Sequence, residues 1–148
     1  MLAPTLYAYM QAYDDVVQWT DGLSDGQIWS RPHGLAPAGF QLRHIAGSVE
    51  RLTAYLRGQQ LTALQLEAVH REMEPGLGRT ALLEVVAGSF QDSGRVIRSL
   101  DPATLIDSRA VGRKQLPTTV AGLVVHLAEH TQRHVGELII TTKLARVT

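Results

Sequence analysis

Four segments of the chain carry apolar residues at helical spacing, and this pattern limits the possible folds more than any other feature. The segments cover roughly residues 3–21, 40–57, 79–100 and 118–143. Each presents an apolar stripe on one side, as a helix does when it packs onto a core. The sequence contains no long alternating strand pattern and no internal repeat. It therefore predicts an all-α fold, a four-helix bundle.

The residues of each stripe follow from counting about 100° per position. Residues 61–73 could add a short helix, and 102–117 are expected to be irregular, with a turn at 112–114. Thr118 or Thr119 is the expected N-cap of the last helix. The predicted stripes, in chain order, are Leu6, Tyr9, Met10, Tyr13, Val17 and Thr20; Leu42, Ile45, Val49, Leu52 and Leu56; Leu83, Val86, Phe90 and Ile97; and Val120, Leu123, Val124, Leu127, Thr131, His134 and Leu138.

Length and composition exclude several classes of protein. A chain of 148 residues fits a single domain, residues 1–148. Lys+Arg and Asp+Glu both number 14, so the formal charges balance. The basic residues form no tract, which argues against a nucleic-acid partner. Cysteine is absent, so any metal site must use histidine and carboxylate. The start of the chain does not resemble a signal peptide, and no segment predicts a membrane span, so a cytoplasmic location is expected.

Three histidines recur at intervals of four in the last segment, at His126, His130 and His134. On a helix, such neighbours lie about 40° apart around the axis and about 6 Å apart along it, so two of them can bind one ion. His134 falls within the apolar stripe, His130 at its edge, and His126 about 80° from His134. His130 and His134 are thus the better pair, with His126 at the rim. Such histidines can equally be ordinary surface or core residues, so a third ligand is needed.

The remaining histidines offer one candidate for that ligand. His44 lies off the apolar stripe of its segment, and can be a ligand only if its own face also turns inward. His33 lies in a loop rich in proline and glycine, and His70 in a charge cluster, so both are expected to be solvated. The face of His44 holds Phe40, Ser48, Arg51 and Tyr55, and the cluster around His70 holds Arg71, Glu72 and Glu74.

Three sequence motifs, in this order and spacing, resemble the DinB-like family of metalloenzymes. They are LSDGQIW at 23–29 followed by Arg31-Pro32, FQLRHIAGS at 40–48 followed by Glu50-Arg51, and HLAEHTQRHVGEL at 126–138. The resemblance covers nearly the whole chain. It implies an up-down-down-up bundle that is often a homodimer. It also implies one divalent ion, usually nickel or zinc, held by one histidine of the second helix and two of the last. The matching positions are His44, His130 and His134.

The resemblance also implies a class of reaction. Related members include S-transferases that use bacillithiol and a mycothiol-dependent isomerase, which suggests a low-molecular-weight thiol as cosubstrate and a small electrophile as substrate. Three neutral imidazoles leave open positions on an ion, as catalytic sites do. Such an ion can activate a thiol or a water. A thiol-dependent S-transferase is therefore favoured. The alternatives are a metal-dependent hydrolase, a non-catalytic metal or small-ligand binder in stress response, and a bundle whose histidines are incidental.

Two further features stay open at this level. Glu129 and Glu137 could support the ligands or transfer protons, or could simply be solvated helix residues. No catalytic residue is assigned. Apolar residues off the main stripes could form a patch for a second copy of the chain, unless the 102–117 segment covers them. These residues are Val16, Trp19, Ile139 and Ile140.

Overall fold

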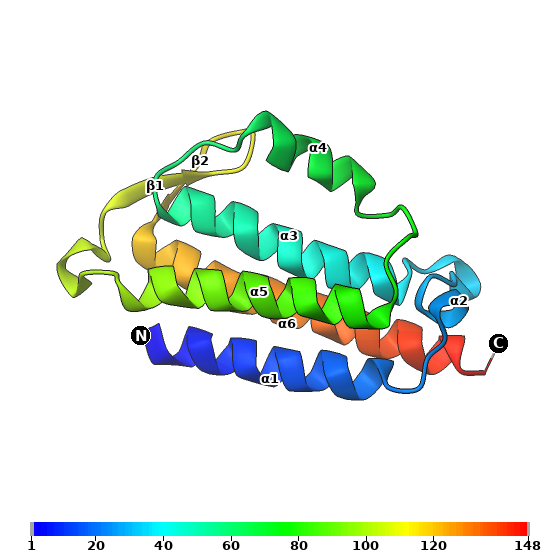
Figure 1. Ribbon diagram of the computed structural model, residues 1–148. Coiled ribbons are helices and arrows are strands. Elements are labelled where there is room, and N and C mark those ends of the chain that lie inside the picture. Colours follow the sequence, from blue (N-terminus) through cyan, green and yellow to red (C-terminus); the bar gives the residue numbers. More distant parts are fainter. Residues whose placement is uncertain (1, 148) are drawn as a thin grey trace.

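The computed structural model describes residues 2–147 and is dominated by helices (Figure 1). The four long helices coincide with the four predicted segments, so the predicted all-α bundle is confirmed. The helices are α1 (Leu2–Thr20), α2 (Asp25–Ile28), α3 (Ala38–Leu56), α4 (Ala63–Arg71), α5 (Arg79–Arg98) and α6 (Val120–Ala145). Single 3-10 turns cover Pro32–Gly34 and Pro102–Thr104, and the strands are β1 (Ser108–Val111) and β2 (Leu116–Thr119).

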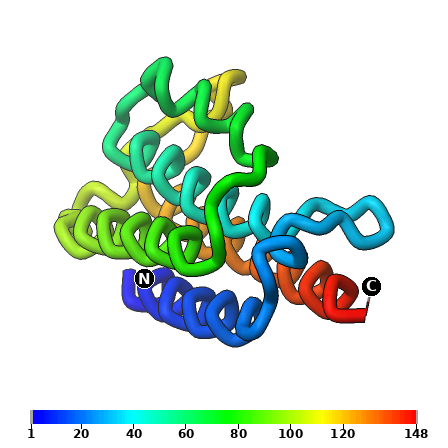
Figure 2. Tube along the Cα trace, turned by 45° about the vertical axis from the view of Figure 1, so that its right-hand side comes forward, coloured from blue at the N-terminus to red at the C-terminus, as the bar shows by residue number. Residues whose placement is uncertain are grey.

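The long helices follow the up-down-down-up order. In Figure 1, α1 and α6 run in one direction, and α3 and α5 run in the other. Helix α6 packs against both α1 and α3, while α5 packs against α3 and α1. Since α3 and α5 are parallel neighbours, the chain must return along the bundle between them, and α4 lies on this return path, outside the bundle (Figure 2). Within the described residues, no helix has both the length and the apolar character needed to cross a membrane.

The core lies between the four long helices and contains one neutral polar chain. All five stripe residues of α3 are buried, as predicted. The hydroxyls of Tyr9 and Thr53 each lie 2.9 Å from Oγ of Ser93, which links α1, α3 and α5. The ring of Tyr9 also stacks on Phe90, with centroids 4.5 Å apart. Each of these hydroxyls therefore has a partner, as buried polar groups require.

The orientation of α1 differs from the prediction. Met10, placed on the inner stripe, is 57% exposed, and Val16, placed on an outer patch, is fully buried. The buried face instead includes Thr5 and Ala12, whose small side chains allow close packing. The hydroxyl of Thr5 donates to the carbonyl of Val124 on α6 at 3.0 Å. The predicted stripe omitted Thr5 and Ala12, which also face the core. The prediction therefore placed α1 in an orientation rotated about its axis.

The segment 102–117 is more regular than predicted. The expected turn forms at Gly112, which has φ 75°, but it joins two short antiparallel strands. The backbone N–H of Val120 donates to the carbonyl of Asp107 at 3.1 Å, so this segment docks at the start of α6. Thr119 is the N-cap, since its hydroxyl accepts from the backbone N–H of Gly122 at 3.1 Å.

The hairpin therefore does not cover the apolar residues near the other end of α6 (Figure 1). Ile140 is 53% exposed, whereas Ile139 and Trp19 pack partly against the core. The patch predicted for a second copy thus loses Val16 but keeps Ile140. The homodimer remains a prediction, which sedimentation at micromolar concentration would test.

Candidate metal centre

Three histidines from two helices meet at the edge of the bundle. His44 comes from α3, and His130 and His134 come from α6. One ring nitrogen of each lies within 4.8 Å of those of the others, and the Nε2 atoms of His44 and His130 are 3.3 Å apart. The mixed face of α3 therefore turns toward α6, as the ligand hypothesis required. The structure brings together the three residues that were predicted as ligands.

His126 stands outside this cluster. Its side chain is 44% exposed, and its Nδ1 faces the carboxylate of Glu129 at 3.5 Å. Among the described histidines, its ring lies beside that of His130, with centroids 5.5 Å apart, as expected for a rim residue. His33 and His70 are exposed, which agrees with the expectation that they are solvated.

Hydrogen bonds hold two of the three rings in a defined orientation. Nδ1 of His134 lies 2.8 Å from Oε1 of Gln41 and 3.2 Å from Oε2 of Glu137. Nδ1 of His44 lies 2.6 Å from Oε2 of Glu72. Both acceptors favour a proton on Nδ1, which leaves the lone pair on Nε2. Each ring thus directs the nitrogen that can bind an ion toward the centre of the cluster.

Two of these supporting residues were missed in the sequence. Gln41 had no assigned role, and Glu72 was placed in a solvated charge cluster with His70. In the structure Glu72 is buried, at 5% exposure, although His70, Arg71 and Glu74 are exposed. Because Glu72 follows α4, only the path of that helix over α3 brings it to His44. No local pattern in the sequence signals this contact.

The geometry fits a divalent ion. Two metal–nitrogen bonds of about 2.0–2.1 Å at a tetrahedral angle place the nitrogens about 3.3–3.4 Å apart. The 3.3 Å between Nε2 of His44 and Nε2 of His130 matches this spacing, and the ligand atoms of all three histidines lie within 4.8 Å of one another. Imidazole nitrogen is also a donor that zinc and nickel accept. The cluster could therefore hold one metal ion.

The surroundings favour the neutral form of two of the three histidines, His130 and His134. Burial, and then repulsion from His134, His44 and His126, lowers the pKa of His130 to about 4. Burial and the neighbouring His44 also lower the pKa of His134, although Glu137 opposes this. Only neutral imidazole binds a metal. At neutral pH, His130 is thus already in the form that an ion needs.

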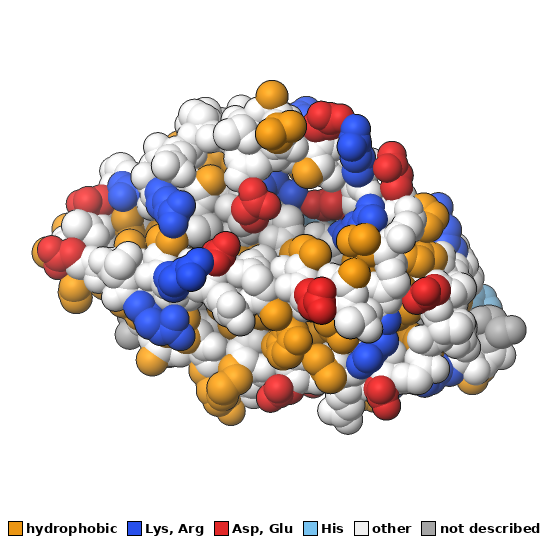
Figure 3. Space-filling model, in the orientation of Figure 1, with side chains coloured by type: hydrophobic (Ala, Val, Ile, Leu, Met, Phe, Trp, Pro, Cys, Tyr) orange, Lys and Arg blue, Asp and Glu red, His pale blue; other side chains and the backbone are white. Residues whose placement is uncertain are grey.

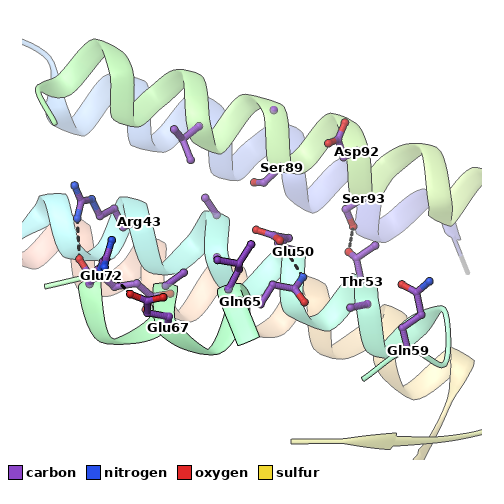
Figure 4. A pocket seen from close by; sticks show the side chains of 18 of the residues that line it. Arg43, Glu50, Thr53, Gln59, Gln65, Glu67, Glu72, Ser89, Asp92 and Ser93 are labelled. Carbon is purple, nitrogen blue, oxygen red and sulfur yellow. Dashed lines mark hydrogen bonds and ion pairs between the residues drawn. The ribbon is translucent and has the colours of Figure 1, made fainter. Parts of the chain in front are cut away.

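A larger cavity lies elsewhere, between α3, α4 and α5 (Figure 3). It measures about 820 Å³ and is lined by none of the three histidines. Its walls carry both acidic and basic side chains, including Glu50, Asp92 and Arg43 (Figure 4). Glu72 lines this cavity and also contacts the histidine cluster. The ring nitrogens that face one another define the candidate metal centre, and this cavity is separate from it.

Comparison with known families agrees with the fold. A sequence model of the DinB superfamily matches residues 8–138. The chain belongs to the DinB superfamily. No curated protein matches the sequence. This DinB protein thus has the bundle that the family resemblance implied, with a histidine cluster that could bind a metal at the predicted positions.

Proposed function

We propose that this DinB protein binds one divalent ion, nickel or zinc, through His44, His130 and His134. We further propose that it is an enzyme, one that transfers a low-molecular-weight thiol onto a small electrophile. One observation carries the proposal: three imidazoles converge from two helices, and acceptors at Nδ1 orient two of them. A histidine that is merely a surface residue needs no such support.

The donor set suits an anionic cosubstrate. An ion held by three imidazoles keeps an open position, where it would lower the pKa of a thiol or a water. Imidazole binds a metal in its neutral form, so three such ligands would leave the charge of the ion uncompensated. Phe40 stacks on His44, with centroids 5.3 Å apart, and adds an apolar side chain beside the cluster. A thiolate with an apolar body fits such a site.

The nearby carboxylates favour thiol transfer over hydrolysis. A metal-dependent hydrolase commonly uses a free carboxylate as general base toward water. Here Glu72 binds His44 and Arg51, Glu137 binds Gln41 and His134, and Glu129 binds Arg133. A thiol has a pKa of about 8.5 and needs less help than water to lose its proton. All three carboxylates are already paired, so none is free to act as a general base. This impedes the activation of water more than the activation of a thiol.

The test combines metal analysis with a substrate screen. Protein purified without a polyhistidine tag should contain one nickel or zinc ion per chain, and His134→Ala should contain none. Thiols offered with electrophiles should be consumed only by the loaded wild type. Hydrolysis without thiol would identify the alternative hydrolase, and bound metal without turnover would identify a binding protein. Wild type without metal would show that the histidines are incidental.

A further inference from the structure

Helix α4 is a peripheral element that polar contacts hold in place. None of the residues of α4 is buried, and Leu64 is 78% exposed. Nε2 of Gln65 donates to Glu50 at 2.9 Å, and Arg43 donates to the carbonyl of Arg71 at 2.7 Å. These contacts span one side of the large cavity, where α4 lies beside α3 (Figure 4). Because α4 has no fully buried residue, polar anchors contribute much of what holds it in position.

Glu72 is the strongest of these anchors. Its Oε2 lies 2.6 Å from Nδ1 of His44, and its Oε1 accepts from Arg51 at 2.7 Å. Burial by itself would raise the pKa of Glu72, but the hydrogen bonds from His44 and Arg51 outweigh it, so its pKa is lowered. A buried carboxylate is tolerated because both of its oxygens are paired.

Gly47 on α3 provides the space for this pair. A Cβ at this position would lie 2.6 Å from Oε1 of Glu72 and 2.7 Å from Nη1 of Arg51, closer than such atoms pack. Glycine inside a helix costs about 0.5–1 kcal/mol relative to alanine. A Cβ at Gly47 would therefore force the ends of the Glu72 and Arg51 side chains to move from their present positions.

We propose that Glu72 is a positioning residue for metal binding, and that it couples the docking of α4 to the occupancy of the metal centre. The inference rests on the proposed function. Glu72 accepts the proton of Nδ1 of His44 and so holds the Nε2 lone pair toward His130. Because coupling is reciprocal, an ion on Nε2 strengthens the contact of Nδ1 with Glu72 and hence the hold on α4.

The first test measures Zn²⁺ affinity by calorimetry on untagged protein. Glu72→Ala should bind about 10–100-fold more weakly than wild type. Glu72→Gln keeps an acceptor oxygen and should recover part of the loss. Glu67→Ala, which removes a half-exposed carboxylate of α4 that pairs with Arg71 and not with a histidine, is the matched control and should bind as wild type. Wild-type affinity in Glu72→Ala would overturn the inference.

Gly47→Ala provides a second route if Glu72→Ala folds poorly. It keeps every charged residue, but its Cβ displaces the Glu72–Arg51 pair. The Zn²⁺ affinity should fall as in Glu72→Ala. Gly88→Ala is the control, since a Cβ there meets no atom within 4 Å. Equal affinities for Gly47→Ala and wild type would contradict the positioning role.

Two readouts separate positioning from a general effect on stability. In a His44→Ala background, Glu72→Ala should cause no further loss of Zn²⁺ affinity, because Glu72 acts through His44. A full additional loss would show that it acts otherwise. Zn²⁺ should also slow amide exchange across residues 63–71 in wild type but not in Glu72→Ala. Exchange that ignores Zn²⁺ in wild type would remove the coupling.

The same experiments distinguish a failure of the proposed metal binding from a failure of the role assigned to Glu72. Wild type that binds no Zn²⁺ would refute the proposed function, and this inference with it. If wild type binds Zn²⁺, His134→Ala does not, and Glu72→Ala matches wild type, only the role of Glu72 is refuted.

Discussion

A chain of hydroxyl groups and a cluster of histidines both place polar atoms among the helices of this bundle, and the two differ in how their hydrogen bonds are completed. In the chain of Tyr9, Ser93 and Thr53, each hydroxyl has a partner within the interior. In the histidine cluster, the outer nitrogens of His44 and His134 are paired but the inner ones face one another. The first arrangement connects helices and is complete. The second directs acceptors at a common point, as a ligand-binding site does.

The largest effect on Zn²⁺ affinity should come from removing one of the three clustered imidazoles. His44→Ala, His130→Ala or His134→Ala should each weaken Zn²⁺ binding by more than about 100-fold, beyond the loss typical of a supporting residue. The affinity of each variant is measured by calorimetry. His126→Ala is the control on the same helix and should bind within a few-fold of wild type. Metal loss in His126→Ala with retention in His130→Ala would show that a different pair binds.

The next effect is a pH dependence of the metal-free protein. The pKa of His130 is about 4 in the folded state and 6.5 when unperturbed, so the unfolded state binds more protons between these values. Stability is therefore complete above about pH 6.5 and is lost as pH falls toward 4. Allowing for solvent screening, we expect a loss of about 1–2 kcal/mol at pH 5. Urea unfolding at pH 7 and pH 5 measures it.

His130→Asn is the control for this pH effect, because it removes the titrating ring. Its stability should change less than that of wild type between pH 7 and pH 5. An equal change in both proteins would assign the effect to other groups.

Breaking the neutral chain should affect stability alone. Ser93→Ala leaves the hydroxyls of Tyr9 and Thr53 without their shared partner, which should cost about 1–2 kcal/mol. Urea unfolding at pH 7 measures the loss, and Zn²⁺ affinity should stay at the wild-type value. A large change in Zn²⁺ affinity would show that the two polar groups are not independent.

The smallest predicted effect is a gain. Within the described part of the chain, Oγ1 of Thr131 is the one fully buried side-chain oxygen or nitrogen without a hydrogen-bond partner. Thr131→Val replaces this hydroxyl with a methyl group of similar shape, so stability should rise by about 1 kcal/mol. The melting temperature of the metal-free protein measures it. A clear decrease would mean that the hydroxyl has a partner in solution.

Helical periodicity in the sequence predicted several features of the core and of the histidine cluster. The stripe of α3 and the positions of His130 and His134 follow from helical spacing, which is local. The position of His44 depended mainly on the family resemblance, because a clearer apolar stripe competes on its helix. The hairpin was missed because its strands are short and one contains Pro117, which cannot donate a ladder hydrogen bond.

The remaining errors concern contacts between distant segments. Glu72 lies in a run of charged residues, and nothing local distinguishes it from Glu74, which is exposed. Only the course of α4 separates the two. Likewise, the orientation of α1 depended on Thr5 and Ala12, which become core residues through the close approach of α6. Burial that a partner helix imposes cannot be inferred from the periodicity of one helix.

The place of α6 between α1 and α3 has a consequence for the order in which the protein matures. His130 follows His44 by 86 residues. A ribosome therefore synthesises α1, α3 and α5 before α6, the helix that carries two of the three clustered histidines. Until then the apolar faces that α6 covers stay open to solvent, and the emerging chain can present no more than a single imidazole of the cluster. A site built from all three histidines can therefore form only once α6 has emerged, and before that the core is unfinished.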